Sequence, residues 1–262
     1  MNLDLTNKRA VVCGSTQGIG KAIAVELAQL GAHVTLVARN EAVLKETTQE
    51  LDNSKGQKHN YLVADFSNPQ ELLSKVQAYA QEQEEVHILV NNTGGPAGGP
   101  ITDAKPEEFL NAFNMHLINN HHLAQAFIPL MKKAGYGRII NIISTSVKQP
   151  LTGLGVSNTI RGAVASWAKT MANELGQFGI TVNNVLPGAT RTARLESIIE
   201  NKAKKTESET DKIEANMMAE IPARRFAEPE EVAAAAAFLA TPAAAYINGI
   251  NVPVDGGRTG CL

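Results

Sequence analysis

Short apolar runs rich in β-branched residues alternate with longer amphipathic stretches along almost the whole chain. The first run, residues 10–13, is followed by glycines and then by residues 21–30, where Ile23, Leu27 and Leu30 recur at helical spacing. Gly31, directly after this stretch, is typical of a helix end. A strand, a glycine turn and a helix in this order are the basic unit of an α/β protein.

The same alternation continues to the end of the chain. Further strands are predicted at residues 33–37, 61–63, 86–90, 138–143, 180–185 and 249–254, and further helices at 41–51, 71–83, 107–132, 154–178 and 230–239. Continuous apolar strands between helices are typical of a parallel sheet that is covered on both faces. The pattern predicts one α/β domain over residues 1–262, without internal repeats or a flexible linker.

Composition places the chain among ordered globular proteins. Hydrophobic residues make up 44% of the 262 residues, and 24 basic against 26 acidic side chains give a formal net charge of −2, which argues against nucleic acid or an anionic membrane as the main partner. Cys13 and Cys261 are too few for a disulfide framework, and the first nine residues contain no apolar signal core. The longest apolar run, residues 232–240, is too short to span a bilayer. We therefore expect a cytoplasmic protein.

The segment at residues 196–220 differs from the rest because it is rich in Lys, Glu, Ala and Thr. It is either a solvated helix with charged faces or part of a lid, at about residues 193–220, since it follows the carboxyl end of the sixth predicted strand. Ligands bind at the carboxyl ends of strands in open α/β sheets. The sequence leaves both interpretations open.

Glycines between the first predicted strand and the first predicted helix favour a nucleotide site. They let a phosphate approach the main chain, and the start of a helix supplies free N–H groups and positive potential. The spacing here is G-x-x-x-G-x-G, which differs from the commoner G-x-G-x-x-G. A tight turn without a ligand is the alternative interpretation of these glycines. Their place between a strand and a helix favours a nucleotide-binding site. The candidate phosphate-binding residues are Gly14, Ser15, Gln17, Gly18, Ile19 and Gly20.

The end of the second predicted strand favours NADP over NAD as the cofactor. An acidic residue at this place binds the ribose 2′-hydroxyl of NAD, whereas an arginine accommodates the 2′-phosphate of NADP. Ala38 offers no carboxylate and Arg39 offers a guanidinium suited to phosphate, although a solvated surface arginine is the alternative. Asp65, after the third strand, could accept a hydrogen bond from the adenine amino group, or it could cap a turn.

Motifs in order along nearly the whole chain resemble the short-chain dehydrogenase/reductase superfamily, and most closely its NADP-dependent 3-oxoacyl carrier-protein reductases. These motifs are residues 14–20, Asp65, residues 91–94, 137–144, 187–192 and 254–257. The resemblance implies a single-domain Rossmann fold with a doubly wound, parallel, seven-stranded sheet. It places Asn91 and Gly94 beside the adenosine half of the cofactor, and Pro187, Gly188 and Thr192 against the nicotinamide.

The resemblance also bears on cofactor choice and assembly. Arg39 matches the arginine of NADP users, but Gln17 stands where a second basic residue often precedes the middle glycine. Members of the superfamily usually form tetramers through the fourth and fifth helices. We therefore expect a homotetramer or homodimer, and the small residues at 162–166 would allow close helix packing.

The catalytic residues that the resemblance implies are only partly present. The superfamily uses a serine, a tyrosine thirteen residues later, a lysine four residues further on and an asparagine on the preceding long helix. The tyrosine transfers the proton and the serine orients the substrate oxygen. The lysine lowers the pKa of the tyrosine and holds the ribose. Ser144 matches the serine, whereas Ser157, Arg161 and His116 stand at the other three positions. No tyrosine lies within residues 154–178.

These replacements change the chemistry that we expect. Arg161 can keep the ribose-binding and electrostatic role but cannot relay protons, and Ser157 is far less acidic than a phenol. His116 is predicted to point inward, where a pKa near about 6.5 would let it exchange a proton at neutral pH, although a buried structural histidine is the favoured alternative. His121 and His122 do not stand at zinc-binding spacing from His116, so we expect no metal.

Two functions remain open. One is an NADP-dependent oxidoreductase that acts on a small carbonyl compound or secondary alcohol, of the 3-oxoacyl or another type, with Ser144 and Ser157 polarising the oxygen and His116 or water supplying the proton. The other is a catalytically weak NADP-binding protein that acts as a sensor or assembly partner. The cofactor motifs favour the enzyme. A hydrolase is excluded because Ser144 lacks the G-x-S-x-G elbow of α/β-hydrolases. The sequence does not identify the substrate, because the loops expected to line it have no fixed geometry in a sequence. These loops are residues 95–100, residues 147–155 and the residues after Thr192.

Overall fold

Seven parallel strands form one sheet in the computed structural model, which describes residues 1–261. The strands are β1 (Arg9–Cys13), β2 (His33–Ala38), β3 (Asn60–Val63), β4 (Ile88–Asn91), β5 (Gly137–Ile142), β6 (Ile180–Pro187) and β7 (Asn251–Val254). Their order in the sheet is β3-β2-β1-β4-β5-β6-β7. The order reverses between β1 and β4, and ligands bind at such a reversal in open α/β sheets. The predicted doubly wound, seven-stranded Rossmann fold is confirmed.

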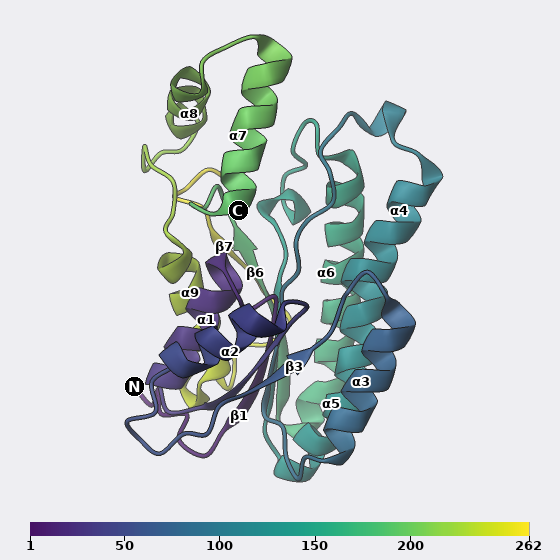
Figure 1. Ribbon diagram of the computed structural model, residues 1–262, viewed down its shortest axis with the longest axis vertical. Helices are drawn as coiled ribbons and strands as arrows, with labels where there is room; N and C mark the ends of the chain where they lie inside the picture. Colours follow the sequence, from purple (N-terminus) through teal and green to yellow (C-terminus); the bar gives the residue numbers. More distant parts are fainter. Residues whose placement is uncertain (262) are drawn as a thin grey trace.

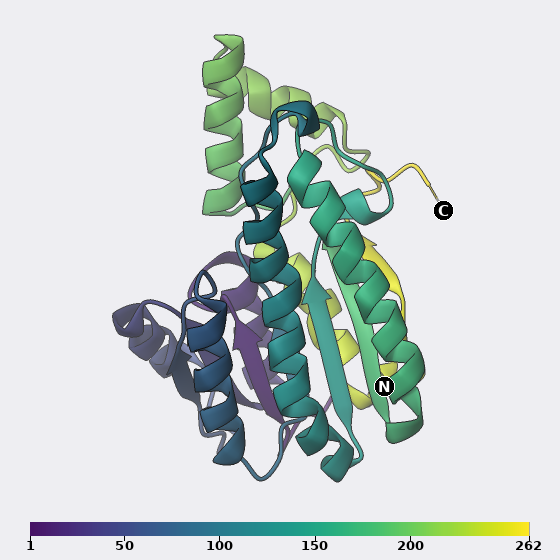
Figure 2. The ribbon, with the colours of Figure 1, turned by 90° about the vertical axis from the view of Figure 1, so that its right-hand side faces the viewer.

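Helices cover both faces of the sheet (Figures 1 and 2). On one face lie α1 (Gly18–Gln29), α2 (Glu41–Glu50) and α9 (Pro229–Ala240), and on the other α3 (Pro69–Gln81), α5 (Asn119–Ala134) and α6 (Gly155–Leu175). Every strand and helix predicted from the apolar pattern is present, with ends that differ by a few residues. No helix within residues 1–261 has the length and apolar character needed to cross a membrane.

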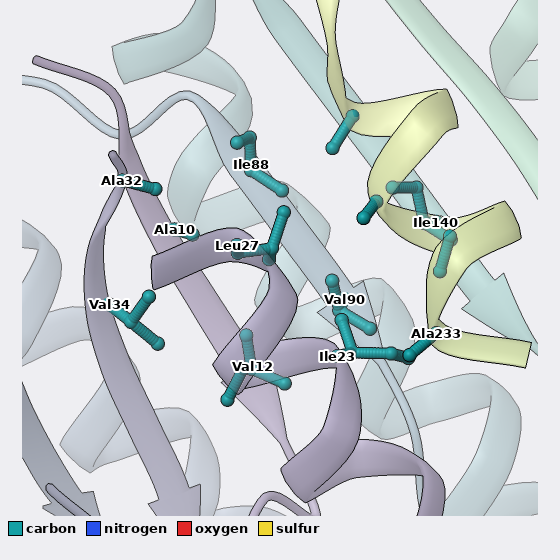
Figure 3. Close-up of a cluster of buried hydrophobic side chains, with 14 of the residues drawn as sticks. Ala10, Val12, Ile23, Leu27, Ala32, Val34, Ile88, Val90, Ile140 and Ala233 are labelled. Carbon is teal, nitrogen blue, oxygen red and sulfur yellow. The ribbon is translucent and has the colours of Figure 1, made fainter. Parts of the chain in front are cut away.

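The core between α1, α9 and the sheet fixes the start of the first helix. Figure 3 shows Ile23 and Leu27 of α1 packed over Val12 of β1 and Val90 of β4, with Ala233 of α9 beside them. All five side chains are buried, and each large one contributes about 1.5–3 kcal/mol by leaving water. Small alanines on α9 allow it to lie close to α1. The core therefore holds α1, and with it the glycine turn at its start, in one position on the sheet.

The predicted helix at 107–132 is not a uniform α-helix. It consists of α4 (Pro106–Phe113), a π-helical turn at Asn114–Ile118 and then α5. A π-turn inserts an extra residue into the helical repeat and is frequently found at functional sites. This turn carries His116, one of the candidate site residues.

The charged segment after β6 forms two helices, α7 (Ala193–Thr206) and α8 (Thr210–Ala219), which break at Glu207 with a φ of 49°. They stand beyond the carboxyl ends of the strands, apart from the layers that cover the sheet (Figure 1). Leu195 and Ile199 of α7 pack with Ile213 of α8 in a small separate core. This position suits a lid, and a lid function stays a prediction.

Four asparagines form a ladder across the second half of the sheet. Asn91 Nδ2 on β4 donates to Asn141 Oδ1 on β5 at 2.8 Å, Asn141 Nδ2 donates to Asn184 Oδ1 on β6 at 2.9 Å, and Asn184 Nδ2 donates to Asn251 Oδ1 on β7 at 2.8 Å. Each bond joins residues that are paired in the sheet register. The ladder therefore fixes the relative heights of β4 and β5 just before the loops that carry the candidate site.

Candidate active site at the carboxyl ends of the strands

The turn between β1 and α1 has the geometry of a phosphate cradle. Gly14 and Gly18 adopt φ of 59° and 53°, which side chains disfavour. A Cβ on Gly14 would lie 2.7 Å from the Asn92 carbonyl oxygen, and one on Gly20 would overlap the Gly14 carbonyl oxygen. Gln17 at the N-cap of α1 makes no side-chain capping bond, so the first N–H groups of the helix are free to bind an anion.

Neighbouring segments hold this turn from two sides. Asn92 Nδ2 donates to the carbonyl oxygens of Cys13 and Gly14, both at 3.2 Å. Buried Ser15 accepts a hydrogen bond from the Val37 N–H at 3.0 Å through its Oγ, so its side chain ties the turn to β2. Ile19 is half-buried and packs against the core that holds α1. The side chains of Ser15 and Asn92 thus support the cradle from behind.

The segment after β6 reaches the same turn. A Cβ on Gly18 would lie 3.1 Å from Thr192 Cγ2, and one on Gly188 would lie 2.7 Å from Asp255 Cα. Pro187 ends β6, and Thr192 caps α7 by accepting a hydrogen bond from the Leu195 N–H. Of the three residues that the resemblance assigns to the nicotinamide, Thr192 therefore lies beside the phosphate cradle.

Basic residues line the other end of the site. Exposed Arg39 directly follows β2 and shares a surface depression with Asn40, Glu41 and Lys45. Lys45 forms an ion pair with Glu41 at 3.0 Å. Lys45 was not predicted from the sequence as a residue of this site. Its position, one turn into the helix that begins after Arg39, could have indicated a second basic side chain near the guanidinium.

Asp65 follows β3 near this depression. Its Oδ1 accepts a hydrogen bond from the Ser67 N–H at 2.9 Å, and that bond, together with the charge of Arg39, holds the pKa of the carboxyl below its usual range. The Asp65 carboxylate is therefore ionised at neutral pH and can accept a hydrogen bond from a ligand.

The structure distinguishes Asn91 from its neighbours. Asn91 is buried and its amide belongs to the ladder across the sheet, so the side chain that contacts the glycine turn is that of Asn92. Gly94 is exposed, and a Cβ there would meet no atom within 4 Å. The open space at Gly94 leaves room for a ligand to pass along the loop.

Ser144 and Ser157 lie at the carboxyl end of β5 and in the first turn of α6. Ser144 Oγ accepts a hydrogen bond from the Ser146 N–H at 3.1 Å, which leaves its own hydroxyl proton for a ligand oxygen. Both serines are partly exposed, and the short helical turn after Ser144 packs against α6. The four tyrosines lie elsewhere: Tyr61 in β3, Tyr79 in α3, Tyr136 before β5 and Tyr246 before β7.

His116 is uncharged at neutral pH. Its side chain is 1% exposed, Nδ1 is 2.7 Å from Thr93 Oγ1, and Nε2 is buried without a partner in residues 1–261. Burial, and then the charge of Arg161, lower its pKa to about 3. The expectation of a pKa near about 6.5 is therefore wrong for His116, because sequence spacing does not show how completely a ring is desolvated.

Arg161 places a buried positive charge one helical turn after Ser157, beside the carboxyl end of β5. Its side chain is 6% exposed and Nη1 donates to the Ile142 carbonyl oxygen at 3.2 Å. Burial, followed by repulsion from Arg194, lowers its pKa to about 10, so Arg161 remains protonated at neutral pH. Hydroxyl donors beside a fixed cation can stabilise negative charge on an oxygen atom. Neither Arg161 nor His116 exchanges a proton readily near pH 7.

Comparisons with known proteins agree with this geometry. The family model described as "Enoyl-(Acyl carrier protein) reductase" matches residues 14–259. The chain is 33% identical over 257 residues to 7alpha-hydroxysteroid dehydrogenase of Escherichia coli K12, covering 98% of this chain and 96% of the relative. It is 34% identical over 256 residues to the 3-oxoacyl-[acyl-carrier-protein] reductase FabG of Vibrio cholerae, covering 97% and 98%.

A solved structure of similar fold is the L-sorbose reductase of Gluconobacter frateurii in complex with NADPH and L-sorbose. It superposes with a TM-score of 0.92 at 30% identity and covers both chains completely, at 100% each. The family match, the curated relatives and the strand order lead to the same assignment. This chain belongs to the short-chain dehydrogenase/reductase superfamily.

Proposed function

We propose that this protein is an NADP(H)-dependent oxidoreductase that reduces a carbonyl group of a small molecule, or oxidises the corresponding secondary alcohol. The observation that carries the proposal is the phosphate cradle at Gly14–Gly20, placed at the same sheet edge as the Ser144 hydroxyl and the buried Arg161 cation. The NADPH complex of the sorbose reductase and the 3-oxoacyl reductase relative support it. An acyl thioester is accordingly one candidate substrate class.

The residues present fit the cofactor. The main chain at residues 14–20 would hold the pyrophosphate, Arg39 the 2′-phosphate and Asp65 the adenine amino group. Pro187, Gly188 and Thr192 would lie against the nicotinamide, which supplies the hydride when NADPH is bound.

The side chains of the site then act on the substrate oxygen. Ser144 donates its hydroxyl proton in a hydrogen bond to the carbonyl oxygen, and Ser157 offers a second donor one helical turn before Arg161. The Arg161 cation stabilises the negative charge that develops on that oxygen and binds the ribose hydroxyls. Water delivers the final proton, because the pKa of His116 is about 3 and that of Arg161 about 10.

Assembly is a further part of the proposal. We infer a homotetramer or homodimer formed through the two long helical stretches, α4–α5 and α6. Leu110 and Phe113 of α4 are 63% and 38% exposed, which is unusual for side chains of this size and suits a face that another copy covers.

Turnover tests the proposed activity directly. We expect NADPH consumption with at least one member of a panel of ketones, diketones and acyl thioesters, and we expect Ser144→Ala to lower kcat/KM by about 10–100-fold because a donor to the oxyanion is lost. Ser74→Ala, an exposed serine on α3, is the matched control. Tight NADPH binding without turnover on the whole panel would favour a binding protein instead. In the same assay, loss of activity in His116→Ala would assign the proton to the histidine rather than to water.

Cofactor selection depends on Arg39. We expect Arg39→Ala to weaken NADPH binding by about tenfold or more and NADH binding by less than about twofold, because only the 2′-phosphate needs the guanidinium. Calorimetric titration of both cofactors measures the difference, and Arg224→Ala, an exposed arginine after α8, controls for charge. An equal loss for both cofactors would refute the assignment of Arg39 to the phosphate.

A further inference from the structure

Two arginines from distant parts of the chain face one point on the loop after β4. A Cβ placed on Gly95 would lie 3.7 Å from Arg194 Nη2 and 3.8 Å from Arg161 Nη2, and it would meet no other atom within 4 Å apart from its chain neighbours. Arg161 comes from α6, whereas Arg194 lies in the first turn of α7. A small group bound at this point would contact both guanidinium groups.

Neither arginine has an anionic partner in the described part of the chain. The arginines that form ion pairs there are Arg191, Arg225 and Arg258. Arg161 bonds the Ile142 carbonyl oxygen, and Arg194 Nη2 donates to the Pro96 carbonyl oxygen at 2.6 Å. A charge buried as completely as Arg161 is unfavourable unless it is paired. The two guanidinium groups therefore lack one anion.

The position of the pair indicates which anion is missing. Gly95 lies on the loop after β4, and Arg161 follows Ser157 by one helical turn, so an anion held at Gly95 would lie at the same sheet edge as the two serines. The glycines of the pyrophosphate cradle have Asn92 and Thr192, and neither arginine, as their nearest neighbours from other segments, whereas the Pro96 carbonyl oxygen holds Arg194 toward the loop after β4. A guanidinium binds a carboxylate through paired N–H donors, and Arg161 has five donors, enough to contact ribose hydroxyls as well.

We propose that Arg161 and Arg194 bind a carboxylate of the substrate, which makes the substrates of this enzyme oxo acids and the corresponding hydroxy acids. This proposal rests on the proposed oxidoreductase function. The carboxylate takes no part in the reaction and is unchanged by it. It anchors the molecule at Gly95 while the carbonyl oxygen lies against Ser144, so the acid orients the carbonyl for reduction.

A matched pair of substrates tests the proposal through turnover. Benzoylformate and its methyl ester carry the same ketone and differ in the charge of the carboxyl group. We expect the wild-type enzyme to reduce the acid with a kcat/KM at least about tenfold above that of the ester. Arg194→Leu should remove this preference, and Lys202→Leu, an exposed charge on the same helix, should keep it.

Two results of this experiment would overturn the proposal. One is a wild-type enzyme that reduces the ester as well as the acid. The other is an Arg194→Leu variant that keeps the preference and instead binds NADPH more weakly in a titration without substrate. The second result would assign the arginine pair to a cofactor phosphate.

A binding experiment keeps the proposal separate from catalysis. We expect benzoate, but not the neutral benzamide, to bind the complex of the protein with NADP⁺ and to lose this affinity in Gly95→Asp, where the new carboxylate reaches both guanidinium groups. Gly95→Asp should also unfold at a higher temperature than Gly95→Ala, which adds the Cβ without the charge. Equal benzoate binding by Gly95→Asp and Gly95→Ala would contradict the subsite.

The outcomes distinguish the subsite from the activity on which it rests. If no carbonyl compound is reduced but benzoate binds in a manner that needs Arg194 and is blocked by Gly95→Asp, the carboxylate subsite stands and the oxidoreductase proposal fails. If ketones are reduced but benzoate does not bind the wild-type complex, the activity stands and the subsite is refuted.

Discussion

Replacement of Asn141 by leucine is expected to lower the free energy of unfolding by about 4 kcal/mol. Asn141 is fully buried in the middle of the asparagine ladder, where it accepts from Asn91 and donates to Asn184. Leucine has a similar volume but leaves the Asn91 amide donor and the Asn184 carbonyl acceptor without these partners inside the sheet. Each buried polar group that loses its partner costs about 1–3 kcal/mol. Urea unfolding of the wild-type and variant proteins measures the difference.

Two further variants give this measurement its controls. Asn60→Leu changes an exposed asparagine on edge strand β3, whose side chain bonds only the neighbouring Tyr61 N–H, and we expect an effect below about 1 kcal/mol. The double variant Asn141→Leu with Asn184→Leu should lower the free energy of unfolding little more than Asn141→Leu alone. The second change removes the unpaired acceptor of Asn184, but it leaves Asn251 Oδ1 without its donor instead. A simple sum of the two single effects would show that the ladder does not act as a connected unit.

The ladder also illustrates what the sequence could and could not predict. Alternation of apolar runs and amphipathic stretches was sufficient to place every strand and the helices that cover the sheet, because burial on both faces of a parallel sheet forces that pattern. The asparagines interrupt the apolar runs of β4, β5 and β6, and their partners depend on strand register. Register arises from pairing between distant segments, so no local pattern reports it.

The π-turn at residues 114–118 was missed for a related reason. One extra residue in a helical turn shifts the faces of the helix only locally, and the apolar spacing on either side still fits an uninterrupted helix. The turn nevertheless decides where His116 lies, next to Thr93 on the loop after β4. The burial that lowers the pKa of His116 follows from this placement.

The candidate site was predictable where it follows spacing along the chain. The positions of Ser144, Ser157, Arg161 and His116 follow from matching the catalytic spacing that the resemblance implies, and the glycine turn follows from its place between a strand and a helix. Arg194 was not predictable. Its approach to Arg161 depends on how α7 begins after β6 and on the path of the loop through Gly95, and neither is fixed by composition.

Acidification is expected to destabilise the protein through two buried histidines. Burial lowers the pKa of His116 to about 3 and that of His87 to about 4, whereas both are near about 6.5 in the unfolded chain. The unfolded state therefore binds more protons below about pH 6.5, and stability is lost as the pH falls from there toward the folded-state values. Between about pH 6.5 and pH 5, each histidine costs about 1.6 kcal/mol, or about 3 kcal/mol together. Urea unfolding at the two pH values measures this loss.

His116→Asn separates the two contributions, because asparagine fills part of the same space and does not titrate. The variant should lose only about half as much stability as the wild type over this pH interval, and that loss is due to His87. Nδ1 of His87 accepts a hydrogen bond from the Arg9 N–H at the opposite end of the sheet. An unchanged pH dependence in His116→Asn would mean that the ring is accessible to protons in the folded protein. In that case the pKa of His116 in the folded protein would be near its ordinary value and not about 3. The histidine would then be a candidate proton donor at the site, beside water.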